Sequence, residues 1–440
     1  MNAALKKVYL QSPGFVQDIG SFFYKGLWYE RFYKKIKDAD YLDRGKTEEQ
    51  QNQSLRKIVR HCYKNVPFYR KAFDKLKLKP KDVKVKEDLD KLPVVSREDI
   101  NSNREMFLAK NISAGNLIAT YTSGTTGSPI KFFLSQKELL YEGARVKKQF
   151  EMAGIDQTKG HFRVGLWLGR EYWTFDEKNK VVFFNPHYFS SRYMGEFISL
   201  IKKYRFECIR GFPSFIYLLA NYCRENNVKD IKFKSAITAS EILLPHWRKA
   251  VEENFGCRVY NQYGVREATI SAMECKMHNG MHIEPTNGIT QIGDNNELIT
   301  TCLVNYTFPL LRYNLKDIAI ITEKKCACGR ETPRISSIQG RTNDIIVTKD
   351  GRLYDASTLS NAIKHLHGHI KECQFVQNDA ESLIVNLALR DREKRKKVKQ
   401  KLRDALKKDF SIKFCIMDNV PRADNGKFKF VVSNFGDMLN

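Results

Sequence analysis

The sequence predicts an α/β protein in which a large N-terminal domain of layered sheets and helices precedes a small, mobile α+β domain. Strand-like and helical segments alternate as far as about residue 300, a pattern typical of helices packed on a sheet. Apolar and polar residues alternate after residue 345, as they do in a hairpin. With 440 residues, the chain is long enough for two or three domains. We expect the boundaries to be 1–341 and 345–440.

The N-terminal half contains four segments with recognisable periodicity. Residues 48–76 are expected to be helical with a break at Pro67, and residues 136–152 form a second expected helix. Residues 116–122 and 129–134 are expected to be strands that flank a polar loop.

Residues 21–37 mix aromatic and lysine side chains and allow two interpretations. One is a helix that covers the edge of the domain. The other is an interfacial helix that lies on an anionic membrane surface.

The C-terminal segment contains the pattern of a small α+β domain. A hairpin is expected over 374–390, around the turn-prone Asn378-Asp379, followed by a charged helix over 391–408. The apolar stripe of this helix is expected to comprise Val398, Leu402, Ala405 and Leu406. Two further strands are expected, at 414–421 and 426–433.

The formal net charge of +25 favours anionic partners such as nucleotides, acidic sugars or a membrane surface. Nucleic acid ranks lower, because the charge is spread along the chain and no nucleic-acid-binding module is recognised. The ten cysteines are scattered, and neither a signal peptide nor a membrane-spanning segment is recognised. We therefore expect a cytoplasmic protein, with peripheral membrane contact as an alternative.

The polar loop between the two expected strands has the composition of an anion-binding loop. The stretch TYTSGTTGSPIKFF, residues 120–133, combines glycines, which permit close backbone approach, with several hydroxyls. It is not a P-loop, because the spacing of its glycines is too short. The candidate phosphate-binding residues are Ser123, Gly124, Thr125, Thr126 and Gly127.

Each of four later stretches is a weak functional signal alone, but their order along the chain makes the set specific. They are NQYGVREA, PLLRYNLKDIAII, IQGRTNDIIVTKDG and PRADNGKFKFVVS. Together with SGTTG they resemble the core motifs of the adenylate-forming acyl ligase superfamily. The stretches NVPFYRKAF, LPVVSREDI, RGFPSFIYLLA and CACGRETPRISSIQGR resemble in particular phenylacetate–CoA ligases and the CapK-type proteins of capsular polysaccharide gene clusters. The resemblance covers nearly the whole chain.

This resemblance implies a nucleotide site and assigns its residues. Tyr263 would stack on adenine, Asp317 would accept the ribose hydroxyls, and Arg341 would contact ribose or phosphate. Ser240, Glu241 and Gly264 would complete the nucleotide-binding set.

Two residues would act on the reaction itself, according to the same resemblance. Glu267 would hold Mg²⁺, and Lys427 would neutralise charge at the α-phosphate from the small domain, which must close and reopen. This sequence departs from the superfamily at Arg266, where threonine is common, and at Asn343, the expected hinge position.

The implied activity is ATP-dependent activation of a small carboxylic acid as its acyl-adenylate, with release of pyrophosphate. The acceptor is expected to be CoA. Two alternatives remain: transfer to an amine or hydroxyl of a sugar in polysaccharide biosynthesis, and a nucleotide-binding scaffold without catalytic activity.

A cysteine pair suggests a separate metal site. Cys326 and Cys328 are close in sequence, and ECKMHNGMHIE upstream supplies Cys275 with two histidines. Three thiols and one imidazole would form a closed structural Zn²⁺ site. The resemblance to the phenylacetate–CoA ligase branch, whose members carry zinc beside CxCGR, supports this. We expect His282 to be the fourth ligand, with His278 as its rival.

Overall fold

The structure is a computed structural model. It describes residues 27–113, 115, 117–121, 130–165, 171–188, 191–267, 269–341, 346–349, 353–354, 356–366, 368–406, 409–423 and 426–433. The expected phosphate-binding loop, Ser123 to Gly127, and the expected hinge Asn343 lie outside these ranges.

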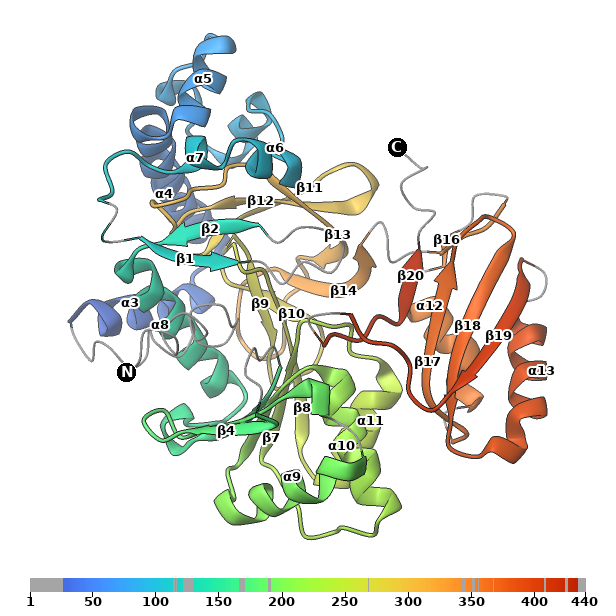
Figure 1. Cartoon of the computed structure of the whole chain (residues 1–440). Coiled ribbons are helices and arrows are strands. Elements are labelled where there is room, and N and C mark those ends of the chain that lie inside the picture. Colours follow the sequence, from blue (N-terminus) through green and yellow to red (C-terminus); the bar gives the residue numbers. More distant parts are fainter. Residues whose placement is uncertain are drawn as a thin grey trace.

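A twelve-stranded mixed sheet forms the centre of the described part of the chain (Figure 1). Its strand order is β11-β12-β13-β14-β10-β9-β8-β7-β6-β3-β5-β4. The parallel portion consists of β5 (Val181–Phe184), β3 (His161–Val164), β6 (Cys208–Gly211), β7 (Ser235–Ala239) and β8 (Arg258–Gly264). The remaining strands are antiparallel: β4 (Trp173–Asp176), β9 (Ser271–Glu274), β10 (Met281–Ile283), β11 (Gly288–Ile292), β12 (Glu297–Cys302), β13 (Tyr313–Thr322) and β14 (Arg334–Arg341).

Helices cover both faces of the parallel strands. On one face lie α9 (Ser191–Tyr204), α10 (Pro213–Glu225) and α11 (Pro245–Phe255), whose apolar residues share a core with Phe162 and Phe184. Most of the aromatic residues of β3 and β5 are therefore ordinary core. On the other face lies α8 (Gln136–Met152), where Val146 and Phe150 pack on apolar residues of β6, β7 and β8.

The helix expected over 136–152 is confirmed, and α8 is buried along most of its length. Outside it lies α3 (Leu27–Asp38), which buries Tyr29 and Ile36 against α8 and leaves Trp28 52% exposed. This packing agrees with an edge-covering helix, while membrane contact stays a prediction. Among the described helices, none has the length and apolarity that a membrane crossing requires.

The expected helix break at Pro67 is also confirmed, since α4 (Arg44–Asn65) ends just before it and α5 (Pro67–Lys75) begins at it. Proline suits the first turn of a helix because it lacks the N–H that has no partner there. The strands expected beside the polar loop form an antiparallel pair, β1 (Ile118–Tyr121) with β2 (Lys131–Leu134). Short helices α6 (Arg97–Ser102) and α7 (Arg104–Phe107) complete this region.

The C-terminal part forms its own four-stranded sheet with the order β19-β18-β17-β20 (Figure 1, orange to red). The expected hairpin is confirmed by β17 (Ile370–Gln377), which pairs antiparallel with β18 (Ser382–Leu389). The outer strands are β19 (Ser411–Met417) and β20 (Val431–Ser433), and the helices are α12 (Ala356–Ile363) and α13 (Arg395–Leu406). A small ladder of β15 (Ile346–Val347) and β16 (Leu353–Tyr354) precedes them.

Some details of the C-terminal prediction are wrong. The strand expected at 414–421 is β19, Ser411–Met417, and the helix expected over 391–408 begins only at Arg395. Ala405 is exposed, because the buried stripe of α13 repeats every four residues, at Val398, Leu402 and Leu406. The last strand begins at Val431 rather than at residue 426. The domain boundaries near residues 341 and 345 stay a prediction.

Candidate active site and metal centre

The carboxyl ends of β7 and β8 bring two of the expected nucleotide-binding segments together. Ala239 of β7 lies opposite Gln262 of β8, so Ser240 follows beside Tyr263. In open α/β sheets, ligands bind outside the carboxyl ends of parallel strands. Ser240 has a φ of 73°, a strained value for a residue with a side chain, and such strain is concentrated at functional sites.

Three strands carry the expected residues Tyr263, Asp317 and Arg341. The Tyr263 hydroxyl donates a hydrogen bond of 2.6 Å to Asp317 Oδ2, and the carboxylate of Asp317 is buried. Asp317 of β13 lies directly opposite Arg341 of β14, whose side chain is outside the described part. An ionised carboxylate has about four acceptor positions, so a carboxylate that accepts the Tyr263 hydroxyl has the chemistry to accept hydrogen bonds from a diol as well.

Glu267 lies next to this group, three residues after Gly264 at the end of β8. Its carboxylate is buried and accepts a hydrogen bond of 3.3 Å from the Tyr313 hydroxyl. A buried carboxylate oxygen is the kind of ligand that Mg²⁺ takes, so the residue fits the role expected of it. Tyr313, which begins β13, was not among the expected site residues.

A contact of its neighbour Phe428 places Lys427 near the carboxyl ends of β7 and β8. The backbone N–H of Phe428 donates to Glu241 Oε1 at 2.6 Å, and the N–H of Ser214 donates to Glu241 Oε2 at 3.1 Å. Lys427 Nζ lies 5.9 Å from the ring centroid of Phe212. Burial raises the pKa of Glu241 above its ordinary value, against the opposing effect of the two N–H groups and of a nearby arginine. The carboxylate of Glu241 thus joins the large sheet to the Lys427 segment.

Two arginines of the small sheet's domain reinforce this junction. The Arg422 guanidinium lies 4.9 Å from the ring of Phe215 and 4.6 Å from the ring of Phe428. Arg390 forms an ion pair with Glu225 at the end of α10. Sequence reasoning missed these contacts, although the segment RGFPSF that supplies Phe215 was part of the resemblance.

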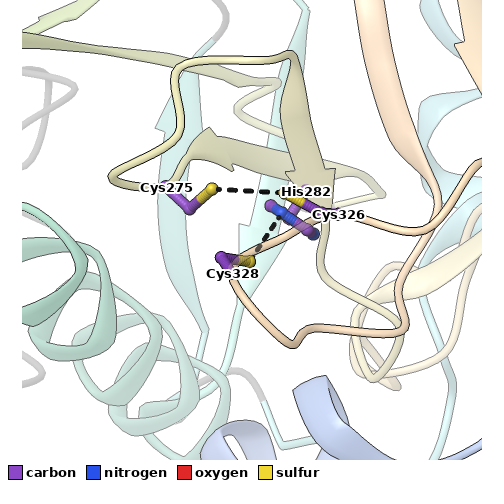
Figure 2. A group of neighbouring side chains, drawn as sticks. All are labelled: Cys275, His282, Cys326 and Cys328. Carbon is purple, nitrogen blue, oxygen red and sulfur yellow. Dashed lines mark hydrogen bonds between the residues drawn. The ribbon is translucent and has the colours of Figure 1, made fainter.

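The expected metal ligands lie together, in the segments around β9, β10, β13 and β14 (Figure 2). Cys275 follows β9, His282 lies in β10, and Cys326 and Cys328 lie between β13 and β14. Cys275 Sγ is 3.7 Å from Cys326 Sγ, and Cys328 Sγ is 3.4 Å from His282 Nε2. All four ligand atoms lie within 4.8 Å of one another. Zn–S bonds of about 2.3 Å at tetrahedral angles place two sulfurs about 3.8 Å apart, so the set fits Zn²⁺.

Neighbouring residues fix the orientation of the His282 imidazole and direct the rival ligand, His278, elsewhere. His282 Nδ1 lies 2.9 Å from Thr332 Oγ1, which leaves Nε2 directed at the cysteine cluster. Burial lowers the pKa of His282 to about 4, so its ring is neutral at physiological pH. His278 is directed elsewhere, with Nδ1 3.3 Å from Glu274 Oε2.

Comparisons with known proteins show the family to which the chain belongs. The family described as "AMP-binding enzyme" matches residues 48–298, more than half of the chain, and the "CapK C-terminal domain" matches residues 346–434. Protein CapK of Staphylococcus aureus is 25% identical, with 98% of this chain and 99% of that protein aligned. Phenylacetate-coenzyme A ligase of Thermus thermophilus is also 25% identical, over 72% of this chain and 75% of the ligase.

Solved structures with the same fold include 2-hydroxyisobutyryl-CoA ligase in two relevant states. Its postadenylation state gives a TM-score of 0.73 at 16% identity, covering 91% of this chain and 92% of the ligase. Its thioesterification state gives a TM-score of 0.58 at 17% identity over 90% and 91%. The overall arrangement of this chain is therefore nearer to the first. The chain belongs to the AMP-binding enzyme family and is an adenylate-forming ligase of the CapK and phenylacetate–CoA ligase type.

Proposed function

We propose that this protein activates a small carboxylic acid with ATP, forming an acyl-adenylate and pyrophosphate, and then transfers the acyl group to CoA. The observation that supports this most strongly is the contact between Phe428 N–H and Glu241, because it brings Lys427 to the sheet end that carries Tyr263 and Asp317. A scaffold without catalytic activity would not need a mobile cation at that position.

In the first step, an oxygen of the substrate carboxylate attacks the α-phosphorus of ATP and pyrophosphate leaves. Two anions meet in this step, so catalysis depends on positioning and on neutralising charge. Asp317 and Tyr263 hold the nucleoside, and Lys427 supplies positive charge close to the α-phosphate and the acid. Glu267 would hold Mg²⁺, which would neutralise charge on the phosphates.

In the second step, the Lys427 segment has to withdraw so that the acceptor can reach the adenylate. The contacts that hold it include the hydrogen bond to Glu241 and the ion pair between Arg390 and Glu225, whose carboxylate is half exposed. Contacts of this kind are individually weak enough to break and reform. CoA is the favoured acceptor, because relatives named as CoA ligases match most of the chain.

A sugar amine or hydroxyl is the alternative acceptor. It is favoured by the match to the CapK C-terminal domain over residues 346–434 and by the full-length likeness to Protein CapK. The small domain would contact the acceptor in the second step, so a different small domain is consistent with a different acceptor.

The exchange of labelled pyrophosphate into ATP tests the proposal. We expect exchange that depends on Mg²⁺ and on one class of acid in a panel of aryl, amino, hydroxy, dicarboxylic and short acyl acids. Adding CoA, and separately candidate sugars, should then release AMP with the correct acceptor. Binding of ATP without exchange for any acid would favour the scaffold instead.

We also propose that Cys275, His282, Cys326 and Cys328 bind one structural Zn²⁺. Four protein ligands leave no open coordination position, which argues for a structural role. The ion would join the segments that follow β9 and β13.

A further inference from the structure

A buried group of four charged side chains lies beside the proposed zinc centre. Lys148 of α8 contacts two carboxylates, Asp40 Oδ1 at 2.5 Å and Glu284 Oε2 at 2.6 Å. The other carboxylate oxygen of Asp40 accepts a hydrogen bond of 2.8 Å from Arg330 Nε. All four side chains are at most 15% exposed, and their charges balance. Buried charges are costly unless they are paired, so each member of this group is held in place by its partners.

This charged group connects two of the segments that supply metal ligands. Glu284 comes two residues after the proposed ligand His282, just beyond β10. Arg330 comes two residues after the proposed ligand Cys328, in the segment between β13 and β14. The two side chains between them come from α8 and from the segment that follows α3. The group therefore bridges both ligand segments through parts of the chain that carry no metal ligand.

Arg330 extends the charged group to a sulfur atom. While its Nε contacts Asp40, its Nη1 donates to Cys328 Sγ at 3.6 Å. A turn at Gly329 makes this possible, with a φ of 88°, a left-handed value that favours glycine, and an N–H that donates to the Cys326 carbonyl at 3.1 Å. The planar guanidinium can thus contact a carboxylate and a thiol at the same time.

The segment that follows α3 holds Arg330 at further points. The backbone N–H of Glu331 donates to the backbone carbonyl of Asp40 at 2.9 Å. The guanidinium carbon of Arg330 also lies 5.6 Å from the ring centroid of Tyr41. The orientation of the guanidinium is therefore determined by protein contacts on the side away from the cysteines.

The chemistry of the proposed metal centre gives this arginine a use. Three thiolates and a neutral imidazole around Zn²⁺ leave one surplus negative charge. Cys328 is the member of the four that is only partly buried. A guanidinium hydrogen-bonded to its sulfur restrains the sulfur and offsets part of that charge. Thr332, in the same segment, restrains the imidazole of His282 in a comparable way.

We infer that Arg330, held by Asp40, is a positioning residue of the proposed zinc centre. Arg330 orients the Cys328 thiolate and compensates the surplus negative charge, so the centre retains its ion more tightly. Neither Arg330 nor Asp40 is itself a metal ligand. The inference rests on the proposed zinc centre and goes beyond its four ligands.

The zinc affinity of the full chain, measured by competition with a chromophoric chelator well below the melting temperature, tests this inference. Arg330→Gln should weaken zinc binding about 10- to 100-fold, the usual cost of replacing a residue that orients a metal ligand. Arg330→Lys keeps the charge but not the planar fork, so its affinity should lie between those of Arg330→Gln and the wild type.

Arg44→Gln is the matched control. Arg44, at the start of α4, also joins an N-terminal helix to the segment between β13 and β14, through Glu323 at 2.6 Å. Its ion-pair partners in the described part of the chain are the carboxylates of Glu48 and Glu323. This variant should therefore change zinc affinity less than about twofold.

A spectroscopic readout separates positioning from a general folding defect. With Co²⁺ in place of zinc, the thiolate-to-metal charge-transfer absorption reports on the geometry of the ligands. Arg330→Gln should shift or weaken this absorption while the far-ultraviolet circular dichroism stays that of the wild type. Asp40→Asn should also weaken zinc binding. The double variant should bind zinc about as weakly as Arg330→Gln alone, because Asp40 acts through Arg330.

Equal zinc affinity in Arg330→Gln and Arg44→Gln would overturn the inference, as would an unchanged Co²⁺ spectrum or losses that simply add in the double variant. If Arg330→Gln does not fold, Arg330→Lys decides, and wild-type affinity in that variant would count against the inference. Failure of the metal centre is distinguishable from failure of the inference. A wild type that binds no zinc would refute both, whereas a zinc-binding wild type whose affinity Arg330→Gln leaves unchanged would refute the inference alone.

Discussion

The proposed metal centre and the proposed nucleotide site lie on one large sheet but are assembled differently. All four metal ligands come from segments around β9, β10, β13 and β14, which are joined by strand pairing. The nucleotide site takes Tyr263 and Asp317 from that sheet, but Lys427 belongs to the segment before β20 in the separate four-stranded sheet. A site built within one sheet suits a permanent structural role, whereas a site built across two sheets can open.

This difference predicts that substitutions reduce pyrophosphate exchange most at Lys427, in the segment before β20, and least at the metal centre. The largest effect is expected for Lys427→Ala. Loss of one charge-neutralising group in such a reaction lowers the rate about 10²- to 10³-fold. ATP binding should change little, because Lys427 acts at the reacting phosphate. The matched control is Lys429→Ala, two residues along the same segment, and equal losses in both variants would contradict the role of Lys427.

Asp317→Asn is expected to weaken ATP binding about 10- to 100-fold, measured by calorimetry, with a matching loss of exchange at low ATP. Hydrogen bonds to charged groups contribute about 1.5–3 kcal/mol, and the amide keeps an acceptor for the Tyr263 hydroxyl. Tyr263→Phe isolates that internal bond, since it keeps the ring and the carboxylate. If Tyr263→Phe weakens ATP as much as Asp317→Asn does, the ribose role of Asp317 is wrong.

Glu241→Gln is expected to lower exchange about three- to tenfold, because an amide accepts the Phe428 N–H less strongly than a carboxylate does. The effect of Glu241→Gln on stability is expected to run opposite to its effect on exchange. Burial raises the pKa of Glu241 in the folded protein. The stability that this group contributes at low pH is therefore lost as the pH rises through that folded-state pKa. At pH 8 the variant should therefore melt no lower than the wild type.

The pH profile of exchange provides the check on Glu241. Wild-type exchange should fall on acidification as Glu241 protonates, above the pH at which an ordinary carboxyl would, and Glu241→Gln should lack that component. Glu225→Gln is the control, because it removes a half-exposed ion pair at the same junction and should cost less than about 1 kcal/mol. An unchanged pH profile in Glu241→Gln would refute the proposed role.

The smallest effect on exchange is expected at the metal centre. Cys326→Ser should remove most of the zinc measured in the purified protein, which we expect to be about one ion per chain. It should also lower the melting temperature by several degrees, because the ion stabilises only the folded state. Exchange per folded molecule at 20 °C should stay within twofold. Cys415→Ser, outside the cluster, should retain zinc, and absence of zinc from the wild type would contradict the proposal.

Local sequence signals predicted much of the fold. The bounds of α8 followed from its periodicity, and in the structure Glu138 accepts a hydrogen bond from the N–H of Ser135, the residue before the helix. The α4–α5 break followed from Pro67. These features depend on neighbours in the chain, so the sequence contains them.

Contacts across the chain could not be predicted in the same way. Sequence spacing allowed either His278 or His282 as the zinc ligand, and the pairing of β10 with β9 and β14 favours His282. The late start of β20 has a similar cause, because the backbone before it is used to bring Phe428 N–H to Glu241.

The central claim is that one nucleotide site is completed by Lys427 when the small domain closes. The most direct test is a crystal structure with a non-hydrolysable ATP analogue. We expect adenine beside Tyr263, the ribose hydroxyls within hydrogen-bonding distance of Asp317, and Lys427 Nζ directed at the α-phosphate. A nucleotide bound away from the carboxyl ends of β7 and β8 would contradict the account.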